Sequence, residues 1–266
     1  MILVAILAVL LVWRVLASSR WPRLDAARSV ARPLGEAARS YVRSAPGTYL
    51  YLFVLLITAW VMQTSSPRIA QRLVLERSTN LHHLATDPVR VLVASAFWVS
   101  AAWHVLAWAV LFTIVLAPAE RWLGTARWAL VFAAGHVGAT LLTAGGLWAA
   151  IKLDAVDESV SRSADVGVSY GFLAVAAVLI YRLPRRLRFP YAAVLGGYLV
   201  IALFTRGTFT DGGHPLAVLI GFACYPLARG LVGRRPEAGL LVVPGARFVE
   251  GCASGASGPV DPMLKC

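Results

Sequence analysis

The chain has 266 residues, of which 59% are hydrophobic and only 14% charged, and its mean hydropathy is +0.70. A soluble domain carries about 25% charged residues, so the composition excludes an ordinary soluble protein and predicts an all-α polytopic membrane protein. The formal charge of +12 does not indicate a nucleic-acid partner, because the basic residues fall in short runs between apolar segments, where they set topology.

The first 47 residues contain two segments of different character. Residues 1–19 begin with an uninterrupted apolar run and are expected to form an extra hydrophobic helix that either spans the membrane or lies at its surface. This run lacks the charged leader and the cleavage site of a secretory signal. Residues 20–47 carry six arginines with helix-compatible apolar spacing, which is typical of an amphipathic segment on an anionic cytoplasmic surface.

Six apolar segments follow and predict a six-helix membrane core over residues 48–232. Their ranges are 48–64, 91–117, 129–151, 167–181, 190–205 and 212–232. With the 20–47 segment inside, 17 of the 25 Lys and Arg residues lie in inner segments and seven in outer ones, as the positive-inside rule requires. We therefore expect a multi-pass protein of the plasma membrane with a cytoplasmic C-terminus, in which residues 233–266 form a flexible tail rich in small residues.

Two polar residues suggest hydrolytic chemistry. Ser169 and His214 each head an apolar segment that enters from the outer side, so the two side chains are expected at similar depth. The serine segment has about 15 residues and a length of roughly 22 Å, less than the ~30 Å hydrocarbon layer, which predicts a dip that admits water. Ala217 and Gly221 share a helical face with His214, and their small size would let the serine helix approach to hydrogen-bonding distance.

The stretch from Gly167 to Gly171 permits other interpretations. It matches the G-x-S-x-G elbow of the α/β-hydrolases, but that elbow needs a preceding strand, and residues 154–165 form a polar loop instead. A serine between glycines also fits close helix packing without any chemistry. The two glycines lie on a different face from the serine, which predicts a helix buried on all sides.

The remaining polar residues receive structural interpretations. His136 is expected to hydrogen-bond a neighbouring helix. Asp211 could supply a carboxylate that orients the His214 imidazole, but its place three residues earlier on the same helix favours a capping role as an N-terminal acid. His82 and His83 form an isolated pair in an outer loop and are expected to be solvated. No Cys and His cluster has zinc spacing, so no metal or cofactor is predicted. The three cysteines lie in the last helix and the inner tail, so no disulfide is expected.

Taken in order, these residues resemble the rhomboid family of intramembrane serine proteases in three blocks. Residues 90–108, followed by residues 119–124, are similar to the family's first block and the loop after it. Residues 166–169 match the GxS part of its GxSG motif, and residues 211–221 resemble its final histidine motif. The resemblance implies a rhomboid-like six-helix transmembrane bundle in which Ser169 is the nucleophile and His214 the general base.

The same resemblance implies which groups hold the oxyanion. His104 stands at the position of the family's oxyanion histidine, and Trp108 fills the position of its asparagine, where the indole N–H would take the place of an amide. Tyr170 and Ala217 replace glycines of the family's motifs, and Leu173 stands where many members have a tyrosine.

Two functions stay open on the sequence alone. The first is a serine endopeptidase that cleaves transmembrane segments of other membrane proteins near the outer face, which needs both Ser169 and His214. The second is a catalytically inactive rhomboid-like protein that binds membrane-protein clients, which the replacements at Trp108 and Tyr170 favour. A small-molecule transporter is less favoured because the sequence has no sign of an inverted repeat. In each of the first two cases the partners are transmembrane proteins and the lipid bilayer.

Overall fold

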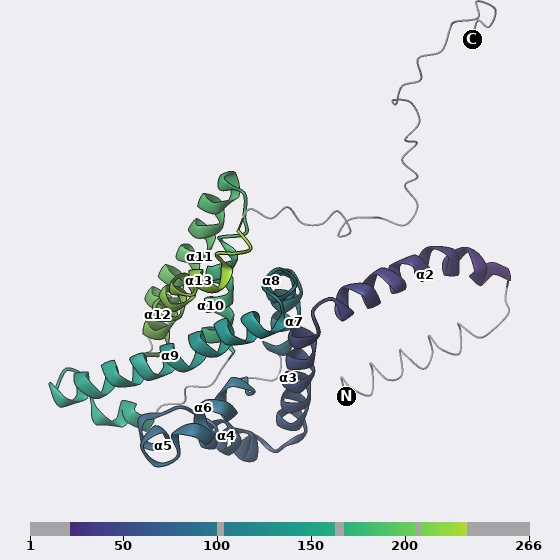
Figure 1. Ribbon diagram of the computed structural model, residues 1–266. Coiled ribbons are helices and arrows are strands. Elements are labelled where there is room, and N and C mark those ends of the chain that lie inside the picture. The colour runs from purple at the N-terminus through teal and green to yellow at the C-terminus, as the bar shows by residue number, and fades with distance from the viewer. Residues whose placement is uncertain (1–21, 100–103, 163–167, 206–208, 233–266) are drawn as a thin grey trace, which may run out of the picture. The chain divides into compact units, whose positions relative to one another are not determined.

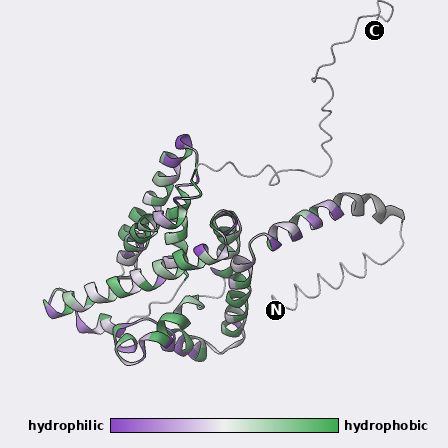
Figure 2. Ribbon diagram, in the orientation of Figure 1, coloured by the Kyte–Doolittle hydropathy of each residue, from purple (hydrophilic) through white to green (hydrophobic). Residues whose placement is uncertain are grey.

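The computed structural model describes residues 22–99, 104–162, 168–205 and 209–232, and every regular element in these ranges is a helix. Four helical segments are long and apolar enough to cross a membrane, namely α3 (Pro46–Thr64), the run His104–Leu123, α9 (Thr125–Lys152) and α11 (Arg185–Thr205). Figure 2 shows hydrophobic residues along these helices. The predicted all-α membrane fold is therefore confirmed, whereas the predicted segments 1–19 and 233–266 lie outside the described residues.

The basic segment 20–47 contains α2 (Pro22–Arg43), as its apolar spacing predicted. In Figure 2 the part of α2 next to α3 carries many hydrophilic residues. The helix is tied to the rest of the chain by Tyr41, whose hydroxyl donates to the carbonyl oxygen of Thr113 at 2.8 Å. The cytoplasmic position of α2 stays a prediction.

Three short helices connect α3 to the next span: α4 (Pro67–Glu76), α5 (Leu81–Thr86) and α6 (Pro88–Ala96). The prediction of one continuous span over residues 91–117 was wrong, because α6 ends at Ala96 and a new helix, α7 (His104–Leu111), begins after the break. The Tyr51 hydroxyl donates to the carbonyl oxygen of Ala96 at 2.5 Å. This bond from α3 satisfies a carbonyl at the C-terminal end of α6 that its own helix leaves open.

The span His104–Leu123 contains α7, a π-helical turn η1 (Phe112–Leu116) and α8 (Ala117–Leu123). In the π turn the amide of Ala117 donates to Phe112 instead of Thr113. The next possible backbone donor for Thr113 is Pro118, which has no N–H. The Thr113 carbonyl thus lacks a backbone donor within its own helix. It accepts a hydrogen bond from the Tyr41 side-chain hydroxyl instead.

Glu120 of α8 joins the starts of two other helices. Its carboxylate accepts hydrogen bonds from the Gly47 amide at 2.8 Å, the Thr48 amide at 2.7 Å and the Thr125 hydroxyl at 2.7 Å. The side chain is only 1% exposed. Gly47 must lack a side chain here, because a Cβ would lie 2.9 Å from a Glu120 oxygen. A negative charge at the N-terminal ends of α3 and α9 also interacts favourably with both helix dipoles.

The core of the bundle is formed by α9, α10 (Ser169–Leu179) and α12 (Phe209–Ala223), each of which packs against the other two. Small residues permit this close packing. A Cβ on Gly135 of α9 would collide with Ala174 of α10, and one on Gly171 would lie 2.5 Å from the Phe132 ring. Figure 1 shows α9, α10, α11 and α12 in the teal to green part of the chain.

The final helix of the core is shorter than the predicted range of 212–232. It ends at Ala223, and the short α13 (Tyr225–Ala228) follows. Pro226 cannot donate to the Phe222 carbonyl, which ends the α-helical pattern. The Tyr181 hydroxyl donates to that carbonyl instead, at 3.1 Å.

Candidate active site

Ser169 is the first residue of α10. This helix has 11 residues, which gives a length of about 16 Å, roughly half the hydrocarbon thickness. All residues from Tyr170 to Leu179 are buried, as predicted for a helix packed on every side, whereas Ser169 is partly exposed. Because α10 is much shorter than its neighbours, its Ser169 end lies deeper in the bundle than the ends of the longer helices.

His214 reaches Ser169 because α12 presents small residues to α10. Ala217 is fully buried, and a Cβ on Gly221 would collide with the carbonyl oxygen of Ala174 in α10. The prediction of a small-residue face beside the histidine is thus confirmed. Close approach of the two helices leaves the His214 Nε2 atom 3.1 Å from the Ser169 Oγ atom, a hydrogen-bonding distance of the kind that activates a serine nucleophile.

Asp211 lies on the other side of the imidazole ring. Its Oδ1 atom is 3.6 Å from the His214 Nδ1 atom, and both side chains are at most 4% exposed. A carboxylate at this place favours the tautomer that carries its proton on Nδ1, which leaves the Nε2 lone pair for the Ser169 hydroxyl. Asp211 is in the first turn of α12, as expected for an N-terminal acid, and its contact with the histidine agrees with the alternative in which it orients the imidazole.

Two tyrosine rings flank the imidazole of His214. The Tyr170 ring meets it edge to face with centroids 5.4 Å apart, and the Tyr198 ring of α11 lies 6.0 Å away. The Tyr170 hydroxyl donates to the Thr210 carbonyl at 3.1 Å, and Gly213 leaves room for it, since a Cβ there would collide with that hydroxyl. In the sequence analysis Tyr170 appears only as a substitute for a glycine of the family motif, and Tyr198 is not identified. The position of Tyr170 directly after the serine could have indicated that its ring lies near the site.

The two residues predicted to hold the oxyanion are in α7. His104 is the first residue of that helix and is partly buried. The Trp108 ring packs edge to face against Phe172, with centroids 5.4 Å apart, and Phe172 is one helical turn after Ser169 on the same side of α10. Trp108 therefore faces the helix that begins with the serine. The oxyanion roles of both residues stay predictions.

A second serine and histidine pair joins α6 to α9, but its geometry differs. The His136 Nε2 atom lies 3.2 Å from Ser95 Oγ and also 2.9 Å from the Leu92 carbonyl oxygen. A carbonyl only accepts, so Nε2 must carry the proton and cannot serve as a base for Ser95. The prediction that His136 is an interhelical hydrogen-bonding residue is confirmed.

Other groups considered in the sequence lie apart from this site. His82 is exposed, and the Nδ1 atom of the half-buried His83 is 3.2 Å from the Ser78 carbonyl oxygen.

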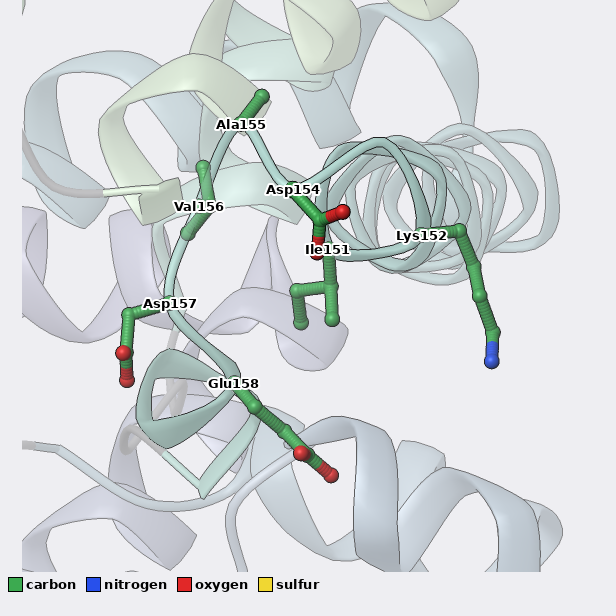
Figure 3. Close-up of a pocket in the computed structure, with 7 residues that line it drawn as sticks. All are labelled: Ile151, Lys152, Asp154, Ala155, Val156, Asp157 and Glu158. Carbon is green, nitrogen blue, oxygen red and sulfur yellow. The ribbon is translucent and has the colours of Figure 1, made fainter.

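Within the described ranges no group of three or more His, Cys, Asp or Glu residues could hold a metal ion. A pocket at the C-terminal end of α9 is lined by residues 151, 152 and 154–158 (Figure 3), and neither Ser169 nor His214 contributes to it.

Comparison with known proteins identifies a family for most of the chain. A family model described as rhomboid-like protein matches residues 40–234, which include α3 to α13 and both members of the Ser169 and His214 pair. No curated protein and no solved structure matches the chain.

Proposed function

The chain belongs to the rhomboid-like protein family, and from this premise we propose that it is an intramembrane serine endopeptidase that cleaves transmembrane segments of other membrane proteins near the outer face. The contact that carries the proposal is the 3.1 Å distance between Ser169 Oγ and His214 Nε2. Family membership and the four apolar helices establish an integral membrane protein. The peptidase activity and the substrates are our inference from the site.

The reaction begins with attack of Ser169 Oγ on the carbonyl carbon of the scissile peptide bond. The His214 Nε2 atom takes the hydroxyl proton as the new C–O bond forms, and then delivers this proton to the nitrogen of the leaving amine as the C–N bond breaks. A water molecule next gives its proton to Nε2 and attacks the acyl ester, which releases the carboxylic acid and restores the serine hydroxyl. Asp211 stabilises the imidazolium that exists between these transfers.

Negative charge develops on the carbonyl oxygen during both attacks. Ser169 begins α10, where the first amide N–H groups have no acceptor within the helix and the helix dipole is positive. We assign the Ser169 amide to the oxyanion together with His104, and we include the Trp108 indole N–H as a third donor. Loss of one such donor lowers the rate on the order of 100-fold. An indole N–H directed at the oxyanion would replace the missing amide donor and avoid this loss.

A catalytically inactive, client-binding member of the family is the second candidate. The observation that favours it is the packing of the Trp108 ring against Phe172 and Phe112, with centroids 5.4 Å and 5.9 Å away. A bulky ring occupies this side of α10 and narrows the space for a substrate carbonyl. Such a protein would still bind transmembrane segments of its clients through the same helices.

Labelling with a fluorophosphonate probe distinguishes the two functions. The detergent-purified full chain is compared with Ser169→Ala and His214→Ala, with equal folding verified by gel filtration and thermal unfolding. Labelling of the wild type that disappears in both variants supports a serine activated by the histidine. A well-folded wild type that takes up no probe contradicts the peptidase proposal and supports client binding.

The orientation in the membrane is also part of the proposal. We place α2 and the C-terminus in the cytoplasm and the Ser169 end of α10 outside, in the plasma membrane, because 17 of the 25 Lys and Arg residues then face inward. A C-terminal fluorescent reporter that folds only in the cytoplasm tests this orientation. Absence of fluorescence from a well-expressed fusion would reverse it.

A further inference from the structure

Two arginine side chains, those of Arg121 and Arg182, lie near one another beside α8, at the end of α10 opposite to Ser169. Arg182 follows the C-terminal end of α10, and its Nη1 atom donates to the carbonyl oxygen of Pro118 in α8 at 2.7 Å. Pro118 and Arg121 are three residues apart and therefore share one face of α8. The guanidinium of Arg182 is thus anchored on the helix face that also presents Arg121.

The surroundings hold Arg121 in place as well. The central carbon of its guanidinium lies 4.8 Å from the centre of the Tyr41 ring, a cation–π contact. The Tyr41 ring is itself fixed by the hydrogen bond from its hydroxyl to the Thr113 carbonyl oxygen. A guanidinium above a ring keeps its N–H groups directed outward in its own plane. Both cations are therefore positioned by contacts that leave most of their donors available.

No carboxylate neutralises this pair within the part of the chain that the structure describes. The arginine ion pairs there join Arg32 to Glu36 and Arg90 to Asp87. Glu120, next to Arg121 in sequence, is turned inward and accepts from the starts of α3 and α9. Burial, and next the charge of Arg121, lower the pKa of the Arg182 guanidinium, which nevertheless remains protonated at neutral pH. The two half-buried guanidinium groups repel each other and no carboxylate compensates them, so binding of an external anion would be favourable.

The neighbouring residues indicate which anion is suitable. Arg188 folds back so that its Nε atom donates to the Leu183 carbonyl oxygen at 3.0 Å, which adds a third positive charge beside Arg182. Tyrosine and tryptophan side chains at helix ends mark the headgroup level of a bilayer, and Tyr41 and Trp122 lie at this end of α2 and α8. A phosphate group matches the forked donors of paired arginines, and anionic lipids supply phosphate at that depth.

We propose that Arg121 and Arg182 form a binding site for the phosphate of an anionic lipid headgroup, bounded by α2, α8 and the turn between α10 and α11. The bound phosphate relieves the repulsion between the two guanidinium groups and connects three elements that are distant in sequence. This site is independent of the chemistry proposed at Ser169.

The test measures how much lipid stays bound to the purified full chain. The protein is purified in a mild detergent, incubated with phosphatidylglycerol or with phosphatidylcholine in mixed micelles, and examined by native mass spectrometry. We expect the wild type to retain phosphatidylglycerol in preference to phosphatidylcholine. Arg121→Gln and Arg182→Gln should each lower the retained phosphatidylglycerol by about tenfold, because each removes charged hydrogen bonds to the phosphate.

Arg185→Gln is the matched control. Arg185 is exposed at the same end of the bundle, so its removal takes away the same charge without touching the proposed site, and retention should stay within about twofold of the wild type. An equal loss in this control would mean that general attraction to basic residues explains the binding, and would overturn the site. Equal retention of the two lipids by the wild type would overturn it as well.

Two further arms complete the design. Arg182→Gln also loses the hydrogen bond to Pro118, so Arg121→Gln, which leaves that bond intact, provides the decisive comparison if the first variant unfolds. Inorganic phosphate at millimolar concentration is added to the lipid-free wild type while thermal unfolding is recorded. Stabilisation by inorganic phosphate equal to that by phosphatidylglycerol would show that the ligand is a soluble anion, and the lipid assignment would be wrong.

Discussion

The contact between α10 and α12 at Gly221 predicts a large effect from a single methyl group. In Gly221→Ala the added Cβ would lie 2.8 Å from both Ala174 Cα and Ala177 Cβ, and closer still to the Ala174 carbonyl oxygen. Ordinary contact begins near 3.4 Å, so the two helices must separate by at least about 0.6 Å. A shift of this size lengthens the 3.1 Å contact between Ser169 and His214 to about 3.7 Å, beyond hydrogen-bonding range.

The expected consequences are a lower stability and a slower reaction. Overpacking of a filled interior lowers the free energy of unfolding by about 1–3 kcal/mol. Misplacement of reacting groups by about 1 Å reduces the rate by about 100-fold. The rate of fluorophosphonate labelling measures the second effect, and thermal unfolding in the same detergent measures the first.

Gly212→Ala is the matched control, because a Cβ at Gly212 of the same helix would meet no atom within 4 Å. It should label and unfold like the wild type. If Gly221→Ala is folded and labels at the rate of Gly212→Ala, the close approach of the two helices does not set the serine and histidine distance, and the reasoning fails.

Three further substitutions test separate contacts. Asp211→Asn should slow labelling of Ser169 by tenfold or more while the chain stays folded, because the amide no longer favours the proton on Nδ1; an unchanged labelling rate would restrict Asp211 to helix capping. Glu120→Gln should lower the free energy of unfolding by about 3 kcal/mol, since an amide NH2 would face buried backbone donors, and a denaturation midpoint equal to that of the wild type would contradict this. Tyr41→Phe should destabilise the chain by about 1–2 kcal/mol by removing the donor to the Thr113 carbonyl, and thermal unfolding measures the difference. Tyr49→Phe should have a smaller effect, because the Tyr49 hydroxyl donates to the side-chain hydroxyl of Thr113 over 3.4 Å and leaves the carbonyl bond intact.

The sequence was sufficient to predict the class of fold because apolar length is a local property. The α3, α9 and α11 helices agree with the predicted segments to within about five residues. The break after Ala96 and the end of α12 at Ala223 were missed. The carbonyls left open at these two ends accept from the hydroxyls of Tyr51 in α3 and of Tyr181 in the turn after α10. Pro226, which ends the α-helical pattern of α12, is itself hidden within an apolar run. Hydropathy does not contain that information.

The candidate site was predictable to a similar degree. The small face formed by Ala217 and Gly221 follows from helical spacing, and it correctly predicted that α12 approaches α10 closely enough for the serine and histidine to meet. The tyrosine rings beside His214 were not predicted, because Tyr198 lies on α11 and its direction depends on the rotation of that helix. The contact of Asp211 with His214 required the rotamers of both side chains, which spacing alone leaves undetermined.

The shortness of α10 has a consequence for the membrane that surrounds the protein. An 11-residue helix of about 16 Å is paired with α9, whose 28 residues extend to about 42 Å. One bilayer cannot match both lengths, so the bilayer beside the bundle must thin or the Ser169 end of α10 must lie at the depth of the hydrocarbon layer. The depth of Ser169 then varies with the thickness of the host membrane: a thicker bilayer covers the serine more deeply, and a thinner one brings it toward the aqueous phase. Lipid chain length thus becomes a physical variable of this site, as much as any residue that lines it.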